Sequence, residues 1–485
     1  MTDKEISTYL GNKGYTIIKS YLERGELAKI KKELTVKPFI PKTSLANAIS
    51  FPIFRESKTK IFLPRFYGLD NFGEPDLNLL KGGESIKLDF AGSLRDYQLN
   101  VIDTWFKNTK NTGCGLIEAS CGAGKTVIAT KIISMLRKKT LIIVHKDFLL
   151  RQWKERIEQF LPDAKIGIIQ GPKIDTENKD IVIGMLQSLS MKDYEPGIFK
   201  QFGFTIVDEC HHVSAEVFSR VLFKSVSKYT LGLSATMNRS DGLTPVFKMF
   251  MGNIAASWKR ESQDNVTVKA IEYINHDINY SNIELNFKGQ TNHVKMISKL
   301  CEFAPRTNFI LDVINRVWDS DTSQQIMVIG HRKDLLGRIH NEITSRGITT
   351  VGYYMGGMKE KELKISEGKN IIIATYQMAE EALDIKTLST IIMITPKKNV
   401  EQAVGRILRS DGDKNVIDIV DQHSNFKRHW DIRRRWYNRE KFKVFYTNNI
   451  RYINNDWDII KNKKARNIKH REEPYKNLLM GKCLI

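Results

Sequence analysis

Short apolar runs recur along the first half of the chain, and stretches with helical periodicity separate them. The runs read GLIEA, TLIIVH, DIVIGM, FTIVDE and TLGLSAT. Continuous apolar runs of this length are typical of strands buried on both faces, and the helices between them supply the crossovers of a parallel sheet. The pattern therefore predicts an α/β lobe over residues 91–260.

A second alternating series follows, with the runs QQIMVIGH, TTVGYYMGG, NIIIATYQ, STIIMIT and NVIDIVD. It predicts a second α/β lobe over residues 291–430. Between the two series the polarity rises around NHDINYSN, beside the strand-like VTVKAIEYI, so we expect a linker over residues 261–290. The overall fold class expected is α/β, with two parallel-sheet lobes.

Both ends of the chain differ from the lobes. Residues 1–90 combine a short helical stretch, Ala28–Leu34, with strand-like alternation in FPIFRESKTKIFLPRFYG, which Pro52 and Pro64 interrupt. This mixture predicts a small α+β N-terminal appendage. Residues 431–485 are basic and aromatic, so we expect a C-terminal extension there.

Composition narrows the class of protein. A chain of 485 residues with 41% hydrophobic and 27% charged positions is long enough for several globular domains. We find no run of about 18 apolar residues that could span a bilayer and no secretory signal pattern at the N-terminus, so we expect a protein that is neither secreted nor membrane-bound. The five cysteines are scattered without a C-x-x-C pair, which argues against a disulfide framework and a zinc or iron–sulfur site.

The net charge of +21 indicates a polyanionic partner, because lysine and arginine release counterions when they meet phosphates. A general richness in Lys, Ile and Asn explains the same charge, so charge alone leaves nucleic-acid binding open.

A loop after the first apolar run has the chemistry of a phosphate site. Ser120 to Thr126 read SCGAGKT, and a helical pattern begins directly afterwards. Glycines allow backbone N–H groups to turn toward anionic oxygens, Lys125 can reach the β- and γ-phosphates, and the Thr126 hydroxyl can ligate Mg²⁺. The pattern departs from G-x-x-x-x-G-K-[ST] only at Ala119. We therefore expect ATP and Mg²⁺ as cofactors.

A pair of carboxylates supports this interpretation. The run FTIVDECHH ends on Asp208 and Glu209. One carboxylate can hold the metal, while the other orients or deprotonates the attacking water. Together with the loop, the pair predicts a nucleotide-hydrolysing site.

Seven ordered segments between Leu94 and Asp421 resemble the motifs of the superfamily 2 helicases. They read LRDYQ, SCGAGKT, VHK, DECHH, LSAT, ATYQMAEEALDI and QAVGRILR. SATMNRSDG and the ending VIDIVDQHSNF are most similar to the XPB-like DExH branch, which includes ATP-dependent helicases of large nucleocytoplasmic DNA viruses, among them the poxvirus transcript-release type. The resemblance implies two RecA-like lobes, with ATP between them and nucleic acid across both.

The resemblance also implies roles for individual residues. The catalytic set is Lys125, Asp208, Glu209, Arg406 and Arg409. The nucleotide-binding set is Arg95, Gln98, Ser120, Cys121, Gly122, Ala123, Gly124, Lys125, Thr126 and Asp384, in which the Gln98 amide matches the edge of an adenine. The metal set is Thr126 and Asp208. Nucleic acid is assigned to His145, Lys146, Gln187, Ser188, His331, Arg332 and Thr375, and coupling to His211, Ser234, Thr236 and Gln402.

Two flanking segments allow two interpretations each. FRESKTKIFLPRFYG interleaves cations with aromatics, so it either grips nucleic acid or forms a small sheet with its aromatics in the core. The basic segment from Lys427 to Lys443 either binds a duplex or forms an amphipathic helix that packs Trp430 and Trp436 on the second lobe.

The sequence thus predicts an ATP-dependent nucleic-acid helicase or translocase. DNA is favoured over RNA as its track, in viral transcription (termination or transcript release) or replication, with a viral RNA polymerase or transcription complex as a partner. We expect a monomer in the virion or host cytoplasm if the protein is viral, and in the cytoplasm or nucleus otherwise. The alternatives are a duplex DNA translocase without strand separation, an RNA helicase, and a binding scaffold whose ATPase has decayed.

Overall fold

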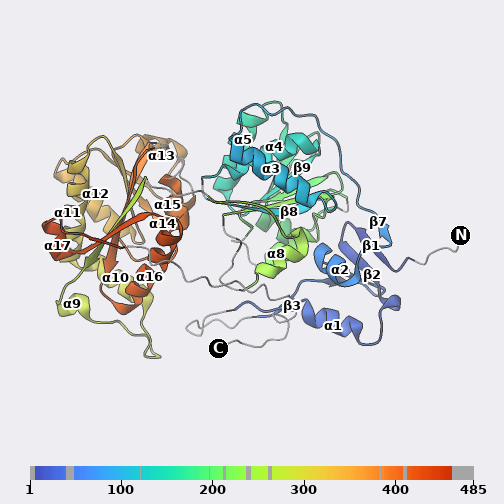
Figure 1. Ribbon diagram of the computed structural model, residues 1–485, viewed down its shortest axis with the longest axis horizontal. Helices are drawn as coiled ribbons and strands as arrows, with labels where there is room; N and C mark the ends of the chain where they lie inside the picture. Colours follow the sequence, from blue (N-terminus) through green and yellow to red (C-terminus); the bar gives the residue numbers. More distant parts are fainter. Residues whose placement is uncertain are drawn as a thin grey trace. The chain divides into compact units, whose positions relative to one another are not determined.

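The computed structural model describes residues 6–39, 49–120, 122–195, 197–210, 215–235, 237, 242–259, 265–381, 385, 387–407 and 412–460. The described residues up to Lys259 form one compact unit, and those from 265 onward form a second. Figure 1 shows both units and the element labels used below.

An eight-stranded sheet forms the centre of the first unit, in the order β11-β10-β12-β9-β13-β14-β8-β15. Its strands are parallel except for β11, which pairs antiparallel with β10. The strands are β8 (Cys114–Ala119), β9 (Thr140–Val144), β10 (Ile166–Gln170), β11 (Lys173–Ile174), β12 (Ile181–Met185), β13 (Phe204–Val207), β14 (Tyr229–Ser234) and β15 (Ile254–Trp258). The five apolar runs of the first series correspond to β8, β9, β12, β13 and β14, which confirms the predicted α/β class.

Helices cover both faces of this sheet. They are α3 (Asp96–Thr109), α4 (Lys125–Leu136), α5 (Asp147–Phe160), α6 (Leu186–Met191), α7 (Ala215–Leu222) and α8 (Thr244–Met251). Along β9, Ile142 faces the core with α3, α4 and α5, while Leu141 and Ile143 face the core with α7 and α8. This alternation is the two-residue period of a strand. Figure 1 shows α3, α4 and α5 on one side of the sheet and α8 on the other.

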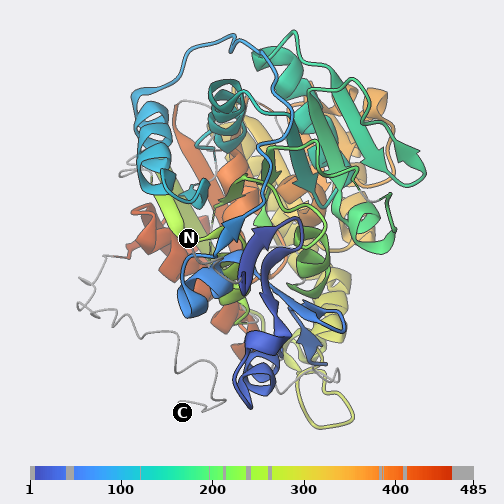
Figure 2. The ribbon, with the colours of Figure 1, turned by 90° about the vertical axis from the view of Figure 1, so that its right-hand side faces the viewer.

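The N-terminal residues form an appendage, which we define as the described residues between 6 and 80. Its five-stranded sheet has the order β5-β6-β2-β1-β7. Its elements are β1 (Thr8–Gly11), β2 (Gly14–Ile18), a 3-10 helix (Lys19–Tyr21), α1 (Glu26–Glu33), β3 (Thr35–Val36), β4 (Phe51–Pro52), β5 (Arg55–Glu56), β6 (Lys60–Leu63), α2 (Arg65–Phe72) and β7 (Leu77–Asn78). The appendage is dark blue in Figure 2.

The appendage shares its core with the lobe. Tyr15, Leu63 and Tyr67 belong to the same buried apolar cluster as Phe223 and Phe250. Phe62 and Tyr67 are buried, so the aromatics of FRESKTKIFLPRFYG fill a core, as the second interpretation of that segment expected. Burial of such large side chains across the junction fixes the appendage to the first lobe.

Two arginines of the same segment also bind the lobe. Arg65 donates from Nη2 to the Thr112 carbonyl over 2.7 Å and from Nη1 to the Lys228 carbonyl over 3.2 Å. Arg55 donates to the Arg220 carbonyl over 3.1 Å. Both guanidinium groups are thus used to join the appendage to the lobe.

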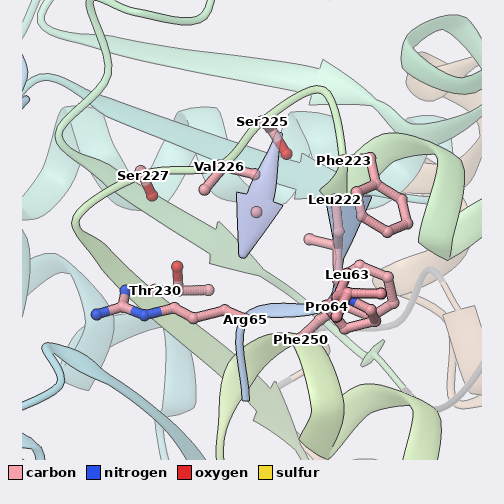
Figure 3. Close-up of a pocket in the computed structure, with 11 residues that line it drawn as sticks. Leu63, Pro64, Arg65, Leu222, Phe223, Ser225, Val226, Ser227, Thr230 and Phe250 are labelled. Atoms are coloured by element: carbon pink, nitrogen blue, oxygen red, sulfur yellow. The ribbon is translucent and has the colours of Figure 1, made fainter. Parts of the chain in front are cut away.

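A small cavity of about 30 Å³ lies at this junction. Figure 3 shows Leu63, Pro64 and Arg65 of the appendage on one side and Leu222 to Ser227 of the lobe on the other. A volume of this size holds about one or two water molecules and no nucleotide. The cavity is therefore a packing feature of the junction.

The second unit has a second eight-stranded sheet, in the order β18-β19-β17-β20-β21-β16-β22-β23, parallel except for β23. The strands are β16 (Val266–Tyr273), β17 (Gln325–Gly330), β18 (Val351–Tyr354), β19 (Ile371–Thr375), β20 (Leu388–Met393), β21 (Lys414–Asp421), β22 (Lys443–Asn448) and β23 (Asp458–Ile459). The helices are α9 (Ile278–Ser281), α10 (His293–Glu302), α11 (Ala304–Ser320), α12 (Lys333–Ser345), α13 (Glu360–Glu367), α14 (Tyr376–Glu381), α15 (Glu401–Ile407), α16 (Ser424–Arg439) and α17 (Asn449–Ile453).

The linker expected over residues 261–290 is corrected by this sheet. Strand β16 lies inside the sheet between β21 and β22. After it, Tyr280 is fully buried and donates from its hydroxyl to Asp421 Oδ1 over 2.8 Å. The polar residues of this region predicted a linker. They lie among the buried positions of β16 and beside the buried Tyr280, so the region is part of the folded lobe.

The boundary expected at residue 431 is also corrected, because α16 continues across it and β22 adds a strand to the sheet. Trp430 and Trp436 are buried. Arg433 is buried as well, and its guanidinium is ion-paired with Asp418 at 2.8 Å. The basic segment therefore forms an amphipathic helix packed on the second lobe, which was one of its two interpretations.

Candidate active site

The predicted site residues of the first unit lie along one edge of its sheet. Parallel strands end at the same edge, and the loops at their carboxyl ends gather there. The phosphate loop follows β8, His145 follows β9, Asp208 follows β13 and Ser234 ends β14. Chain segments far apart in the sequence thus meet at a single edge.

The phosphate loop has the backbone that its glycines permit. Gly122 has φ of 80° and Gly124 has φ of 74°, both in the left-handed region. A Cβ added at Gly124 would lie 2.5 Å from Gln98 Nε2, so a larger residue cannot stand there without displacing that amide. Helix α4 begins at Lys125, directly after Gly124, and its N-terminal N–H groups favour an anion.

Gln98 braces the loop. Its Oε1 accepts from the Arg95 backbone N–H over 3.0 Å, and its Nε2 donates to the Ala123 carbonyl over 3.1 Å. Tyr97 donates its hydroxyl to the same carbonyl over 3.1 Å. Both ends of the Gln98 amide therefore have backbone partners, and the adenine contact expected for this residue stays a prediction.

The two carboxylates face the loop lysine. Lys125 Nζ lies 3.4 Å from Glu209 Oε1, and both side chains are largely buried. Asp208 accepts from the Trp153 indole N–H at Oδ2 over 2.8 Å and from the Glu209 backbone N–H at Oδ1 over 2.9 Å. Glu209 has φ of 47°, a left-handed backbone that is uncommon for a non-glycine residue and typical of functional turns. The loop and the carboxylates thus form one site.

Asp208 shows that this site favours a cation. Burial raises the pKa of Asp208 to about 6, and the neighbouring Glu209 carboxylate adds to the increase, while Lys125 opposes it. Two adjacent carboxylates with one lysine carry surplus negative charge in a poorly hydrated place. Asp208, with the Thr126 hydroxyl at the start of α4, therefore fits a hard divalent ion such as Mg²⁺, which prefers oxygen ligands.

The remaining candidates of the first unit differ in exposure. Lys146 is the N-cap residue of α5, directly after His145. Gln187 is exposed on α6, whereas the Ser188 hydroxyl accepts from the Gly171 N–H over 2.9 Å. Ser234 is fully buried at the end of β14, opposite Glu118 of β8. Of these five, Gln187 is the most accessible to a ligand.

The second unit gathers its candidates in the same way. His331 and Arg332 follow β17, and Thr375 ends β19 beside it. On α15, Arg406 donates to the Glu380 carbonyl over 2.6 Å, one helix turn after Gln402. Five other candidates lie outside the described residues: Cys121, His211, Thr236, Asp384 and Arg409.

Sequence reasoning missed two side chains of the site. Trp153, on α5, holds Asp208, and Tyr97 both donates to the loop and stacks on Trp258 with ring centroids 4.1 Å apart. Tyr97 lies inside the LRDYQ segment, between the predicted site residues Arg95 and Gln98, so its position in the sequence could have identified it as a site residue. Trp153 has no comparable signal, because its contact with Asp208 depends on tertiary packing.

A family model described as "Type III restriction enzyme, res subunit" matches residues 91–239. A protein of Acanthamoeba polyphaga mimivirus, named as an ATP-dependent RNA helicase (L396), is 35% identical over 454 residues, covering 90% of this chain and 86% of the relative.

The chain belongs to the superfamily 2 helicases, in their XPB-like DExH branch.

Two further relatives show the breadth of this helicase family. QP509L of African swine fever virus (strain Badajoz 1971 Vero-adapted), also named as an ATP-dependent RNA helicase, is 25% identical, covering 73% of this chain and 74% of the relative. The DNA 3'-5' translocase XPB2 of Sulfurisphaera tokodaii is 25% identical, covering 67% of this chain and 81% of the relative. The helicase is thus an ATP-dependent enzyme built around two mostly parallel sheets.

No cluster of three or more His, Cys, Asp or Glu side chains in the described part of the helicase could hold a metal ion. None of the helices described is both long and apolar enough to cross a membrane.

Proposed function

We propose that this helicase converts ATP hydrolysis into movement along DNA. The observation that carries the proposal is the Lys125–Glu209 contact of 3.4 Å beside the buried Asp208, at the edge where the sheet's parallel strands end. Such an edge, with a phosphate loop and two carboxylates, is the arrangement used to hold a nucleotide and activate water.

Each residue has a role that follows from its chemistry. The loop N–H groups and Lys125 bind the phosphates, and Glu209 accepts a proton from the attacking water. Asp208 and Thr126 hold Mg²⁺, which neutralises phosphate charge when bound. Arg406 stabilises charge that develops on the γ-phosphate, with Arg409 as its expected companion.

Residues at the carboxyl edges of both sheets supply the grip on nucleic acid. His145, Lys146 and Gln187 lie at that edge of the first sheet, and His331 and Arg332 lie at that edge of the second. Contacts of these types go mainly to phosphates, which gives affinity without sequence preference. A motor that passes along many sequences requires such a grip.

DNA as the track is favoured by the relationship to the DNA translocase of Sulfurisphaera tokodaii. RNA is the second candidate, because two of the viral relatives are named as RNA helicases. Steady-state ATP hydrolysis on single- and double-stranded DNA and RNA of matched length and sequence separates the two. We expect DNA to stimulate turnover more than RNA. Greater stimulation by RNA would reverse the assignment, and no stimulation by any of the four would refute the function.

Two different substrates distinguish strand separation from movement along the duplex. Displacement of a third strand from a triplex, without unwinding of a forked duplex, would identify a translocase that does not separate strands. Unwinding of the fork at a rate that depends on ATP would identify a helicase in the narrow sense.

The cellular role that we propose is release of transcripts, or another step of transcription or replication, in the cycle of a large DNA virus. The viral relatives support it. The partner would be a viral RNA polymerase or transcription complex, and the site of action the virion or the cytoplasmic factory. Addition of the helicase to stalled elongation complexes tests the role, and ATP-dependent release of the transcript is the expected result.

A further inference from the structure

Three histidines of the second unit come together from three separate elements. His293 begins α10, His331 follows β17 and His429 lies on α16. The rings of His293 and His429 have centroids 5.2 Å apart, and both rings pack against Phe426. The His331 ring packs on Tyr376, with ring centroids 4.7 Å apart, and lies within electrostatic range of His293 and His429. We call His293, His331 and His429 the histidine cluster.

Further cations surround the histidine cluster. Lys397 and Arg332 act electrostatically on His331, and Lys398 acts on His429. Arg332 donates to the Ser298 hydroxyl of α10 over 2.6 Å, which holds its guanidinium beside the helix that carries His293. Four segments of the fold therefore direct positive or protonatable groups to one place.

The neighbouring carboxylates already have cationic partners. Glu380 lies 2.5 Å from Lys397, and Asp418 is paired with Arg433. The charged groups that act most strongly on His331 and His429 are all cationic. These two acids are thus paired with two of the neighbouring cations, and the cations that we assign to the ligand are the other two, Arg332 and Lys398.

The histidines are accessible to solvent and have lowered pKa values. His293 and His331 are exposed at the surface, and His429 is half-buried. Partial loss of hydration, followed by the neighbouring positive charges, lowers the pKa of both His331 and His429 to about 4. Loss of hydration also lowers the pKa of His293. The rings are therefore neutral at pH 7, and an anion placed among them would raise their pKa values.

A structural role alone does not explain this arrangement. His331 Nδ1 shares a hydrogen bond of 2.8 Å with the Thr395 hydroxyl, which orients the ring. Among the described residues, by contrast, no hydrogen-bond partner is present for the buried Nδ1 of His429. The lysine and arginine side chains beside the neutral rings create a positive potential, which favours an anionic ligand.

We propose that the histidine cluster, with Arg332 and Lys398, binds a backbone phosphate of the nucleic acid and takes up protons as it does so. The inference rests on the proposed function, since the phosphate belongs to the track. It adds His293 and His429, from α10 and α16, to the His331 and Arg332 already assigned to nucleic acid. The grip on the second lobe then strengthens as pH falls.

The linkage has a definite sign. Because the pKa values of His331 and His429 are about 4, these two rings bind few protons in the free protein at pH 6 to 7, and phosphate binding increases their proton uptake. If binding is coupled to the full uptake of one proton, affinity for the nucleic acid rises by up to about tenfold for each unit by which the pH falls. The phosphodiester itself stays ionised over this range, so the protons are taken up by the protein.

The test measures affinity of the full-length helicase for a fluorescent oligodeoxythymidine by anisotropy, from pH 5.5 to 8.0 at constant ionic strength. The double variant combines His293→Gln and His429→Gln. Both substitutions keep a polar side chain that cannot become charged. His340→Gln is the matched control, because His340 is a histidine of the same lobe with a lowered pKa that stacks on Tyr353, with ring centroids 4.0 Å apart. We expect wild type and control to gain at least about fivefold more affinity on acidification than the double variant.

Calorimetry of the same binding in two buffers of different ionisation enthalpy at pH 6.5 counts the protons directly. We expect net uptake in wild type and a smaller uptake in the double variant. Equal pH profiles and equal proton uptake in the two proteins would overturn the proposal. If wild type binds no nucleic acid at any pH, the proposed function fails as well, so the two failures are distinguishable.

A further arm separates two sources of the phosphate. Inorganic phosphate is titrated into the free protein while the histidine ring signals are followed by NMR. A shift of the His293 and His429 signals only with the oligonucleotide assigns the site to the nucleic-acid backbone. Saturation by millimolar inorganic phosphate, with no effect of the double variant on oligonucleotide binding, would assign a free-anion site and refute the proposal.

Discussion

Lys125 Nζ of the phosphate loop lies 3.4 Å from Glu209 Oε1, on the loop that follows β13. This pair joins the two halves of the catalytic site, because one residue binds phosphate and the other activates water. Strand β14 lies between the strands that carry them, so only the folded sheet brings them together.

Lys125→Ala should lower ATP turnover by about a hundredfold or more, since it removes a preorganised charge from the site of phosphoryl transfer. Steady-state hydrolysis with saturating nucleic acid is the measurement. Lys131→Ala is the control, because Lys131 lies on the same helix with its ammonium over the Phe90 ring. Full turnover by Lys125→Ala would remove this lysine from the site.

Glu209→Gln should separate binding from hydrolysis. The amide keeps the size of the side chain but cannot accept the proton of the water, so turnover should fall by about 10²–10⁴ while nucleotide still binds. Binding of a fluorescent ATP analogue and single-turnover hydrolysis measure the two steps. Glu158→Gln, on the exposed face of α5, should leave both unchanged. Loss of nucleotide binding together with hydrolysis would contradict the assigned role.

Arg433→Met tests whether α16 is part of the lobe. It leaves the Asp418 carboxylate buried without its partner, which costs about 3–5 kcal/mol. Hydrogen exchange of β21 and α16 should become faster. Arg434→Met is the matched control at the next position, where the arginine is partly exposed and pairs with Asp431, and it should cost less than about 1 kcal/mol. Equal exchange in the two variants would show that the pair does not stabilise the lobe.

Arg65→Met should loosen the appendage. The substitution removes the hydrogen bonds to the Thr112 and Lys228 carbonyls at about 1–3 kcal/mol. Limited proteolysis should then cut between the appendage and the lobe sooner than in wild type. Lys58→Met, at an exposed position of the same segment, should not change the cleavage rate. If Lys58→Met accelerates cleavage as much, the arginine contacts do not hold the junction.

The sequence predicted those parts of the fold that local patterns encode. The apolar runs of β8, β9 and β13 and the glycines of the phosphate loop are contiguous, so each could be identified without knowledge of the tertiary structure. The segment of β16 was predicted to be strand-like, but it was placed in a linker because of the polar NHDINYSN that follows it, and its position between β21 and β22 had no local signal. The Trp153–Asp208 hydrogen bond joins positions 55 residues apart and had no local signal.

Charged residues predicted binding sites less reliably than apolar runs predicted strands. For Arg55, Arg65 and Arg433 the sequence left open whether they bind nucleic acid or belong to packed elements, and in the fold each binds a carbonyl or carboxylate of the protein itself. The sequence does not show whether a basic side chain faces solvent or a buried acid. Only the residues that surround it in the fold determine this. The histidine cluster shows the converse, since its three members are scattered in sequence and meet only in the folded lobe.

ATP-dependent displacement of streptavidin from biotinylated DNA tests the central claim most directly, because it requires hydrolysis to produce movement along the track. We expect the wild-type protein to displace streptavidin with ATP, and Lys125→Ala to bind the DNA without displacing it. ATP hydrolysis by the wild type with no displacement from either end of single- or double-stranded DNA, or from RNA, would contradict the account.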